Sequence, residues 1–425
     1  MLRDRFQVHA VQTGLNMSTF EQVVIVGGCG HVGLPLGLVF ASRGVRVTLL
    51  DIDKDKVEKV NRGEMPFLEK GASELLRQVV GRGLEATLDD GCLAAADAAI
   101  AVVGTPVDRY LNPTLRNLCR SVDGLVDRLS DDSLLVLRST VYPGVTKIVY
   151  DRVRALGRKV HVAFCPERIA EGSAIEELTQ LPQIIAAFEP EAMNRTRKLF
   201  SILSSDIIEL SPTEAELAKL FTNSWRYLNF AISNQFYVLA QSYGLDFYRI
   251  YDAVTRDYPR MASFSRAGFA AGPCLLKDTL QLAAFAGNNF FMGQAARLVN
   301  EGLPNYLVEQ LRPSGLANKC VAILGMAFKA DSDDVRDSLS YKLRKLLEVE
   351  AREVLCTDPY VQDPSLVPLE QALASADIFV LGAPHSVYQS LSFPADKQVV
   401  DVWNFWPKPK AAPLKMEAEV FPLKG

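Results

Sequence analysis

A cysteine in the second half of the chain is the first candidate for chemistry. Cys274 follows Gly272 and Pro273, a pair typical of the residues that lead into a helix and begin it. We therefore predict a helix from Pro273 to Ala284, with Cys274 in its first turn. There the unpaired backbone N–H groups and the helix dipole favour a thiolate over a thiol.

Two charged residues are expected beside this thiol. Lys277 and Asp278 follow Cys274 by three and four residues, so a helix would place all three on one face. A thiolate next to an ammonium and a carboxylate is equipped for covalent catalysis. The alternative, a small buried hydrophobic residue, is the usual fate of an unpaired cysteine, and other features of the chain must decide.

The composition excludes several classes of protein. With 425 residues, 48% apolar and 23% charged, the chain is expected to form two or three globular domains. Its 46 basic and 50 acidic side chains give a formal charge of −4, too balanced for a nucleic-acid-binding surface. The cysteines lack the spacing of disulfides or a metal site, so a reducing cytoplasm is expected. No apolar run has membrane-spanning length, and residues 1–20 are expected to be a disordered leader, with Met17 as another candidate start.

A glycine-rich segment near the beginning indicates a dinucleotide site. A buried-strand pattern runs into Gly28-x-Gly30-x-x-Gly33, and a helix and a second strand ending at Asp51 follow. The glycines let the backbone approach a pyrophosphate at the helix N-terminus. Asp51 would accept hydrogen bonds from the ribose hydroxyls and repel a 2′-phosphate, so we predict NAD rather than NADP.

The same order of patterns recurs in the last third of the chain. Strand patterns at 321–328, 353–358 and 377–384 repeat the glycine strand, the acid-ending strand and a later strand at 98–106. We therefore predict an α/β fold with two Rossmann-like domains. The second copy lacks the glycine motif, so we expect it to bind a ligand other than a dinucleotide.

A long helix is predicted between the two copies. Ser211, Pro212 and Glu214 supply an N-cap, a first-position proline and a capping-box glutamate, and helical spacing continues to Tyr243, over about 48 Å. The apolar positions that keep this spacing are Leu217, Leu220, Phe221, Leu228, Ile232, Phe236 and Leu239. The polar stripe opposite, interpreted as a solvated face, consists of Lys219, Asn223, Arg226 and Asn234.

These patterns predict a division into domains. After the leader, residues 21–210 would form the NAD-binding domain and residues 306–425 the second Rossmann-like domain. Residues 211–305 would form a helical middle domain that carries the long helix, often a dimer interface.

Six further groups of residues occur in order along the chain. They are Gly104-Thr105-Pro106; Ser139-Thr140-Val141-Tyr142-Pro143-Gly144; Cys165-Pro166-Glu167-Arg168 with Glu171-Gly172; Lys219 with Asn223; Cys274 with Lys277 and Asp278; and Phe328-Lys329 with Asp333, Asp334 and Arg336. With these motifs, residues 21–405 resemble the nucleotide-sugar 6-dehydrogenases, which include UDP-glucose and UDP-N-acetylhexosamine dehydrogenases.

The resemblance implies a four-electron oxidation of a sugar C6 alcohol to a carboxylate, with two NAD⁺ consumed at one site. Cys274 would trap the intermediate aldehyde as a thiohemiacetal, and a thioester would then be hydrolysed. Lys219 and Asn223 would stabilise the oxyanion, while Asp278 and Thr140 would hold a water that acts as base.

The remaining roles also follow from the resemblance. Glu167 or Glu171 would assist hydrolysis, with shaping of the nicotinamide site as the alternative main role of Glu171. The implied NAD contacts are Gly28, Gly30, Val32, Gly33, Asp51, Lys56, Thr105, Thr140 and Glu171. The implied nucleotide-sugar contacts are Arg168, Ile169, Lys219, Asn223, Arg226, Tyr258, Arg260, Gly268, Lys329 and Arg336. Arg260 is expected to reach into the neighbouring subunit of a homodimer; no metal, nucleic acid or membrane is expected.

The substrate is less constrained than the reaction. Arg168 resembles the UDP-N-acetylhexosamine branch, but UDP-glucose and GDP-mannose stay open because residues 269–271 replace usual glycines and Trp403 stands where an arginine normally contacts the nucleotide. A two-electron dehydrogenase of the 6-phosphogluconate or 3-hydroxyacid kind is a second hypothesis. A non-catalytic sensor of NAD and nucleotide sugar is a third.

Overall fold

The computed structural model describes residues 20–102, 115–270 and 272–406, with side chains omitted for 115–121. Contacts divide the chain into two units, 1–220 and 221–425. The predicted leader is wrong at its last residue: Phe20 is 2% exposed and packs in the core of the first unit. The rest of the leader, with Met17, lies outside the described residues.

The first unit contains an eight-stranded sheet in the order β3-β2-β1-β4-β5-β6-β7-β8. Its strands are β1 (Gln22–Val26), β2 (Arg46–Leu50), β3 (Leu84–Thr87), β4 (Ala98–Ala101), β5 (Leu134–Leu137), β6 (His161–Phe164), β7 (Gln183–Ala187) and β8 (Ile207–Leu210). All neighbours pair in parallel except β6 and β7, which are antiparallel. In register, Val24 lies between Thr48 and Ala99.

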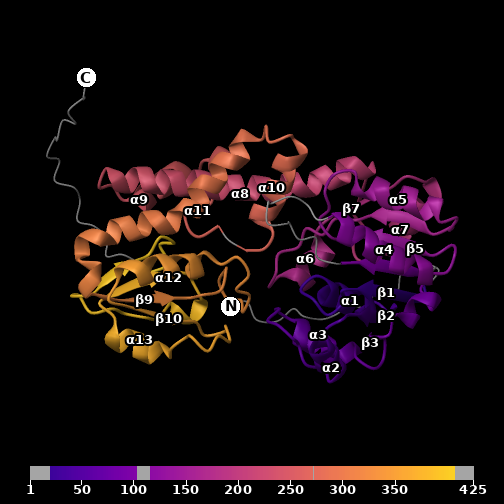
Figure 1. Cartoon of the computed structure of the whole chain (residues 1–425), viewed down its shortest axis with the longest axis horizontal. Coiled ribbons are helices and arrows are strands. Elements are labelled where there is room, and N and C mark those ends of the chain that lie inside the picture. Colours follow the sequence, from indigo (N-terminus) through magenta and orange to yellow (C-terminus); the bar gives the residue numbers. More distant parts are fainter. Residues whose placement is uncertain (1–19, 103–114, 271, 407–425) are drawn as a thin grey trace. The chain divides into compact units, whose positions relative to one another are not determined.

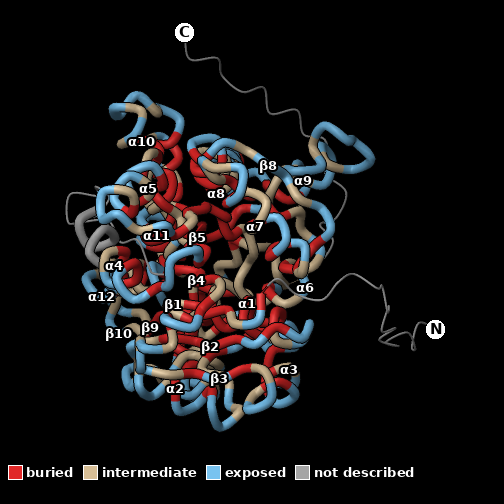
Figure 2. Tube along the Cα trace, turned by 90° about the vertical axis from the view of Figure 1, so that its right-hand side faces the viewer, coloured by how far each residue is buried: buried red, intermediate tan, exposed pale blue. Residues whose placement is uncertain are grey.

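Helices cover both faces of this sheet (Figure 1). They are α1 (Gly33–Ser42), α2 (Lys54–Asn61), α3 (Ala72–Val79), α4 (Leu115–Arg128), α5 (Val145–Ala155), α6 (Ala174–Gln180) and α7 (Pro190–Phe200). Val23 and Ile25 of β1 pack in a core with α1, α3 and α7, whereas Val24 between them packs in a core with α4 and α5. Because side chains alternate along a strand, both faces of the sheet are buried, and Figure 2 shows the central strands as buried.

Helix α8 (Pro212–Ser242) begins where the capping pattern predicts. The backbone N–H and the hydroxyl of Ser211 both donate to Glu214 Oε2, at 2.8 and 2.6 Å. The helices that follow are α9 (Phe247–Thr255), a 3₁₀ turn η2 (Pro259–Met261), α10 (Leu275–Phe285) and α11 (Phe291–Leu311). The expected domain boundary between residues 305 and 306 lies inside α11.

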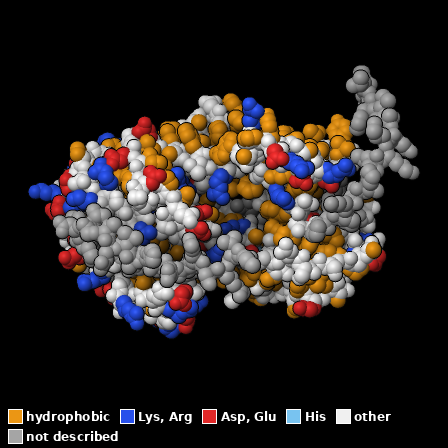
Figure 3. Space-filling model, turned by 180° about the vertical axis from the view of Figure 1, so that it is seen from behind, with side chains coloured by type: hydrophobic (Ala, Val, Ile, Leu, Met, Phe, Trp, Pro, Cys, Tyr) orange, Lys and Arg blue, Asp and Glu red, His pale blue; other side chains and the backbone are white. Residues whose placement is uncertain are grey.

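Only part of the apolar face of α8 is covered within this chain. Leu220 is buried (0%), whereas Phe221 (56%), Ile232 (41%), Phe236 (48%) and Leu239 (53%) are exposed. The prediction of a solvated polar stripe is wrong. Three of the four residues of the expected solvated stripe are instead buried: Lys219 (8%), Asn223 (3%) and Asn234 (0%). Amides can be buried where they meet polar partners inside the protein. In the view of Figure 3, hydrophobic side chains gather along the upper edge, where Figure 1 shows α8 and α10.

The second unit contains a four-stranded parallel sheet in the order β10-β9-β11-β12. Its strands are β9 (Cys320–Leu324), β10 (Glu353–Thr357), β11 (Ile378–Leu381) and β12 (Gln398–Val400). Its other helices are α12 (Leu339–Glu350), α13 (Leu369–Ser375) and the 3₁₀ turns η3 (Arg312–Ser314), η4 (Leu316–Asn318) and η5 (Ser386–Tyr388). This order repeats β2-β1-β4-β5 of the first sheet, which confirms the prediction of two Rossmann-like folds. In the described part of the chain, no helix combines the length and apolarity needed to cross a bilayer.

Candidate active site

The glycine loop after β1 is packed as tightly as a dinucleotide-binding turn requires. A Cβ on Gly28 would lie 2.6 Å from Ile25 O, and a Cβ on Gly33 would lie 2.7 Å from Gly27 O. Neither position accepts a side chain without a backbone shift. The sequence motif therefore marks positions where the loop, β1 and α1 must approach closely.

One face of the same loop is open. A Cβ on Gly30 would have only Gly27 O within 4 Å, at 3.6 Å. Val32 is the N-cap of α1, and the first turn that follows contains Gly33, Leu34 and Pro35. Leu34 N donates to Gly30 O at 3.0 Å and proline has no N–H, so the positive end of the helix dipole is the main attraction for an anion here. Cys29 N donates to Asp51 Oδ2 at 2.9 Å, which joins the loop to the end of β2. These residues fit a dinucleotide, with its pyrophosphate at the loop.

Asp51 lies where the sequence predicts, directly after β2. Its Oδ1 accepts from the backbone N–H groups of Ile52 and Asp53, at 2.8 and 3.1 Å. Lys56, a predicted cofactor contact, lies on α2, where its ammonium is 3.3 Å from the Asp53 carboxylate. Thr105, another predicted contact, lies outside the described residues.

Thr140 lies in the connection between β5 and α5 and is half-buried. The end of this connection is fixed by Glu216 of α8, which is 1% exposed. Glu216 accepts from Gly144 N at 2.6 Å, Thr146 N at 2.8 Å and Thr146 Oγ1 at 2.6 Å. A carboxylate thus satisfies the N-terminal donors of α5 and holds the segment that carries Thr140.

Glu167 is engaged in a buried ion pair. Arg138, 1% exposed, donates from Nε to Glu167 Oε2 at 2.8 Å and from Nη2 to Gln183 Oε1 at 3.3 Å. The other carboxylate oxygen accepts from Arg168 N at 2.7 Å and Ile169 N at 3.1 Å. Burial lowers the pKa of Arg168. This arrangement suits Glu167 to holding the predicted substrate residues Arg168 and Ile169 in place.

The turn that contains Glu171 is held by a residue that the sequence interpretation missed. Glu69, 8% exposed, accepts from Gly172 N at 2.7 Å and Ala174 N at 2.9 Å. Glu171 itself is half-buried. The two bonds span more than 100 residues of sequence, so no local pattern marks Glu69.

Cys274 is the N-cap of α10 rather than a residue of its first turn. The helix begins at Leu275, two residues later than predicted, because Gly272 takes a left-handed φ of +99° and Pro273 and Cys274 continue a turn. An N-cap side chain still faces the unpaired N–H groups of the first turn. The thiol is exposed and not in a disulfide, so the buried-hydrophobe interpretation is wrong.

A buried carboxylate lies one turn after this thiol. Asp278 has a side-chain exposure of 0% and accepts from Asn223 Nδ2 of α8 at 2.6 Å. The ammonium of Lys277 is 3.5 Å from Asp278 Oδ1. Lys219 lies one turn before Asn223 on α8. The structure therefore unites Asn223 with Asp278 and Lys277, residues that are more than 50 positions apart in sequence.

The other described cysteines are poor candidates for a nucleophile. Burial raises the pKa of Cys29 and Cys356 to about 12 and that of Cys92 to about 11, and burial also raises the pKa of Cys165. A thiol with such a pKa holds little thiolate near neutral pH.

Gly268 packs between α8 and the end of the second sheet. Asn234 of α8 accepts from Gly268 N at 2.9 Å and donates to Gly268 O at 3.0 Å, while Asn300 accepts from Asn234 at 2.9 Å. A Cβ on Gly268 would lie 2.3 Å from the Trp403 indole. Trp403 therefore closes against the glycine backbone at this predicted substrate position.

Lys329 and Arg336 both lie in the connection between β9 and α12. Arg336 pairs with Asp334, whose Oδ1 and Oδ2 each accept from Arg336 Nε at 2.9 Å. The Arg336 side chain is 51% exposed and that of Asp334 is 4% exposed. The carboxylate fixes the base of the guanidinium group while leaving its outer side accessible.

This connection contacts the loop that leads to Cys274. Gly272 N donates to Asp337 O at 3.5 Å, and a Cβ on Gly272 would lie 2.6 Å from the Phe328 ring. The predicted nucleotide-sugar loop and the predicted nucleophile loop are thus neighbours within the second unit.

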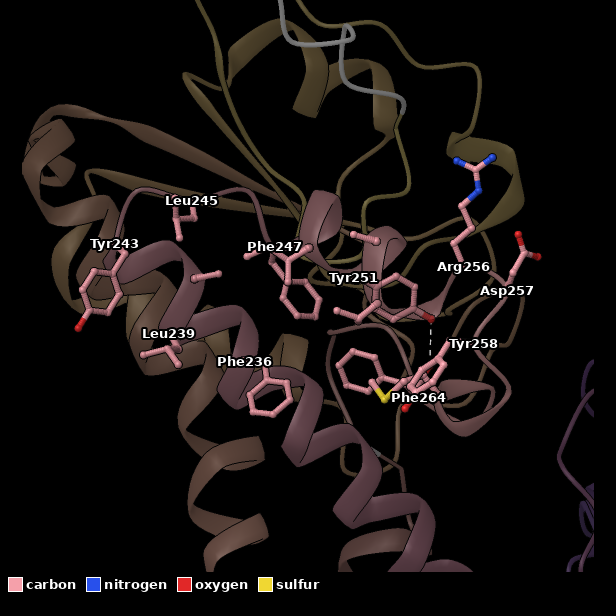
Figure 4. Close-up of a pocket in the computed structure, with 15 residues that line it drawn as sticks. Phe236, Leu239, Tyr243, Leu245, Phe247, Tyr251, Arg256, Asp257, Tyr258 and Phe264 are labelled. Atoms are coloured by element: carbon pink, nitrogen blue, oxygen red, sulfur yellow. Dashed lines mark hydrogen bonds between the residues drawn. The ribbon is translucent and has the colours of Figure 1, made fainter. Parts of the chain in front are cut away.

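Tyr258 lines an apolar pocket of ≈ 860 Å³ between α8, α9 and η2 (Figure 4), and Arg260 lies in η2. Phe236 and Leu239 of α8 and Tyr251 of α9 contribute to its lining. The Arg260 guanidinium lies 5.6 Å from the centre of the Tyr258 ring. Arg226, also predicted to bind substrate, is exposed on α8.

No group of three or more His, Cys, Asp or Glu side chains in the described ranges is arranged to hold a metal ion. The groups described above include an exposed thiol, a buried carboxylate with its amide partner, and an open glycine turn.

Three matches to one protein family cover most of the chain. Residues 21–204 match the NAD binding domain of the UDP-glucose/GDP-mannose dehydrogenase family, residues 213–302 its central domain and residues 322–408 its UDP binding domain. The first of these matches confirms the prediction that the cofactor is NAD.

Proteins similar to this chain are dehydrogenases of nucleotide sugars with or without an N-acetyl group. The UDP-N-acetyl-D-mannosamine dehydrogenase of Pyrococcus horikoshii is 29% identical over 383 residues, 87% of this chain and 91% of the relative. A solved structure of the enzyme from that organism has a TM-score of 0.85 at 28% identity and covers 91% of this chain and 96% of its own. A UDP-glucose dehydrogenase structure from Pyrobaculum islandicum has a TM-score of 0.84 at 29% identity, with coverages of 92% and 95%. The chain is an NAD-dependent nucleotide-sugar dehydrogenase and belongs to the UDP-glucose/GDP-mannose dehydrogenase family.

Proposed function

We propose that this enzyme oxidises the C6 hydroxyl of a UDP-N-acetylhexosamine to the uronic acid through a covalent adduct on Cys274. The observation that carries the proposal is the exposed thiol at the N-cap of α10, one turn before the buried Asp278 that accepts from Asn223 at 2.6 Å. The net reaction converts one CH₂OH group, two NAD⁺ and one water into a carboxylate, two NADH and three protons.

Cys274 supplies the nucleophile in this scheme. When bound, NAD⁺ accepts a hydride from C6 in each of the two oxidations. The thiolate adds to the aldehyde carbon after the first oxidation, the second oxidation leaves a thioester, and attack by water releases the thiolate. Covalent capture keeps the aldehyde in the site until the second oxidation.

The neighbouring side chains have distinct tasks. Lys219 and Asn223 stabilise the oxygen that gains negative charge when the thiolate or water adds to the carbonyl. Asp278, with Thr140, holds the water that takes up the proton released from the C6 hydroxyl. Glu167 acts mainly by orienting Arg168, because its carboxylate is already paired with Arg138.

NAD is assigned to the first sheet and the nucleotide of the sugar to the second. The open turn at Gly30 and the acid at Asp51 support the first assignment. The match of residues 322–408 to a UDP binding domain supports the second. Lys329 and Arg336, in the loop after β9, would contact the sugar nucleotide there.

UDP-N-acetylmannosamine is the first substrate to test. It is the substrate named for the Pyrococcus horikoshii relative, and Arg168 fits the N-acetylhexosamine branch. UDP-glucose is the second candidate because the Pyrobaculum islandicum enzyme is also similar. Rates with UDP-ManNAc, UDP-GlcNAc, UDP-GalNAc, UDP-glucose and GDP-mannose would rank the sugars, and activity on UDP-glucose alone would contradict the proposed branch.

The number of NADH molecules formed per sugar consumed tests the reaction itself. The proposal requires two. A two-electron dehydrogenase would give one, and a non-catalytic sensor would give none. Product analysis for the uronic acid would exclude release of the aldehyde, which would accompany only one NADH per sugar.

A homodimer through α8 is also part of the proposal. Phe236 and Leu239 of α8, and Tyr243 directly after it, are exposed and line the apolar pocket with residues of α9, and a second copy would bury this surface. Arg260 beside the pocket would then reach the partner's substrate. Mixed dimers of Arg260→Ala and Cys274→Ala should regain activity, because one site receives both residues intact; no recovery in verified heterodimers would contradict this assignment.

The cytoplasm is the proposed location. NAD and nucleotide sugars are intracellular metabolites, and the six cysteines whose state is described are not in disulfides.

A further inference from the structure

His385 is a buried residue for which the proposed reaction has no use. It follows β11, precedes η5 and is 0% exposed. Its Nε2 lies 2.9 Å from Asp358 Oδ2, at the end of β10. Tyr360 and Tyr388 place their rings edge-on, 5.1 and 5.6 Å from the imidazole centre.

The hydrogen bonds define the protonation of this ring. Asp331 N donates to His385 Nδ1 at 2.9 Å. A backbone N–H can only donate, so Nδ1 is the acceptor and the ring proton is on Nε2, which donates to Asp358. The imidazole therefore links the end of β10 to the backbone of residue 331.

Asp331 is also hydrogen-bonded to Ser386, the residue that follows His385. Asp331 Oδ1 also accepts from Ser386 N at 2.8 Å and Ser386 Oγ at 3.0 Å. Asp331 has a left-handed φ of +51°, a conformation that aspartate adopts more readily than most non-glycine residues. The bonds to His385 and Ser386 hold the residue in this conformation.

Asp331 lies between Lys329 and Arg336. Within the same connection Phe328 N donates to Asp334 O at 2.9 Å, and Ser338 Oγ donates to Ala327 O at 3.3 Å. The described hydrogen bonds therefore hold the start and end of the connection together, while His385 holds its middle.

We propose that His385 is a positioning residue for nucleotide-sugar binding, which holds the β9–α12 connection in its binding geometry through the Asp331 backbone. The inference rests on the proposed function, because that function assigns Lys329 and Arg336 to the sugar nucleotide. His385 does not itself touch the substrate in this scheme.

Two variants separate the two hydrogen bonds of the ring. The side-chain amide of asparagine occupies the place of Nδ1, so His385→Asn can still accept from Asp331 N but cannot reach Asp358. Glutamine places its amide nitrogen near Nε2, so His385→Gln can donate to Asp358 but leaves Asp331 N without its acceptor. Both variants remove the ring, so they are matched for lost packing.

The measurement is calorimetric binding of UDP and, separately, of NAD⁺ to the intact enzyme. His385→Gln should weaken UDP binding by about tenfold or more, the effect of one lost hydrogen bond in a buried site. His385→Asn should stay within about threefold of wild type, and NAD⁺ binding should not change in either variant. In turnover, His385→Gln should raise KM for the nucleotide sugar more than it lowers kcat.

Each outcome decides between positioning and simple stability. If His385→Gln binds NAD⁺ and UDP like wild type, or if both variants lose UDP binding equally, the positioning role is wrong. Should His385→Gln not fold, the exposed Ser386→Ala, which removes one bond to Asp331, should weaken UDP binding by about threefold; unchanged binding would overturn the proposal. If wild-type enzyme binds no UDP, the proposed function fails instead.

Discussion

The two Rossmann-like sheets use the same acidic position in different ways. Asp51 directly follows β2, and Asp358 directly follows β10, the equivalent strand. Each accepts from the turn after the first strand of its sheet: Asp51 from Cys29 N at 2.9 Å and Asp358 from Met326 N at 2.6 Å. The acid therefore has a structural task in both copies, which is to hold that turn against the neighbouring strand.

The two carboxylates differ in whether they can accept further hydrogen bonds from a ligand. Asp51 is half-buried, and its other described hydrogen bonds come from the two residues that follow it, so a ribose can approach. The Asp358 side chain is 0% exposed and accepts from Ala327 N and His385 as well. The Asp358 carboxylate is therefore enclosed by groups of the protein, whereas Asp51 keeps an accessible side for the ribose that we propose it binds.

The largest expected effect is a loss of catalysis that leaves both nucleotide-binding sites intact. Cys274→Ala should lower the rate of complete oxidation by about a thousandfold or more, because no other group can form the thioester. Binding of NAD⁺ and UDP should persist, since the thiol is assigned to neither nucleotide. NADH formation and uronic acid would be measured together.

Cys92→Ala is the matched control. Burial raises the pKa of Cys92 to about 11, so this thiol is not expected to react, and its removal should leave the rate near wild type. Uronic acid formed by Cys274→Ala at a near-wild-type rate would show that Cys274 is structural.

The second prediction tests the open turn of the first copy. Gly30→Ala should fold, since the added Cβ meets only Gly27 O at 3.6 Å, yet it should weaken NAD⁺ binding by about a hundredfold because the methyl group occupies the approach of the pyrophosphate. UDP binding should not change. Gly124→Ala, on the exposed side of α4 with no atom within 4 Å of its Cβ, is the control, and equal NAD⁺ affinity for both variants would contradict the assignment.

The third prediction concerns Asp358, the buried acid of the second Rossmann-like sheet. Burial alone would raise the pKa of Asp358, but hydrogen bonds from His385, Tyr360 N and Ala327 N hold it down at about 2. Because the folded pKa lies below the ordinary value near 4, the carboxylate stabilises the fold above pH 4. This contribution, about 2 kcal/mol, should be lost as the pH falls from about 4 to about 2.

Tryptophan fluorescence can follow this loss selectively. The three tryptophans, Trp225, Trp403 and Trp406, all lie in the second unit, so denaturant unfolding detected by their emission reports on that unit. The stability difference between wild type and Asp358→Asn should shrink on acidification from pH 6 to pH 3. A difference that is independent of pH would refute the low pKa.

The sequence predicts those features of the molecule that are determined by residues close together along the chain. The glycine loop, Asp51 and the start of α8 follow from spacing and capping, because the groups involved are a few residues apart along the chain. The exposed faces of α8 could not be predicted in this way. An amphipathic pattern shows that Phe236 and Leu239 need an apolar partner, but not whether that partner is the same chain.

The supporting residues were missed for a similar reason. Arg138 is 29 residues from Glu167, and Asp358 is 27 residues from His385, and no periodicity connects such pairs. Each becomes recognisable only when the parallel strands bring their ends together. The start of α10 was displaced by two residues because the turn at Gly272 depends on its packing against Phe328.

The smallest expected effect concerns Asp51, the acid of the first sheet, and its difference from Asp358. In Asp51→Ala the ribose hydroxyls lose their acceptor and a 2′-phosphate is no longer repelled, so the kcat/KM ratio of NADP⁺ to NAD⁺ should rise by about tenfold. The change should be specific to this position, because Asp55→Ala, an exposed acid on α2, removes the same charge without altering the end of β2. The fold should tolerate Asp51→Ala better than Asp358→Ala, since Asp51 is only half-buried. If wild-type enzyme already uses both cofactors equally, or if Asp55→Ala shifts the ratio as much as Asp51→Ala does, then Asp51 does not select the cofactor, and the two acids differ only in burial.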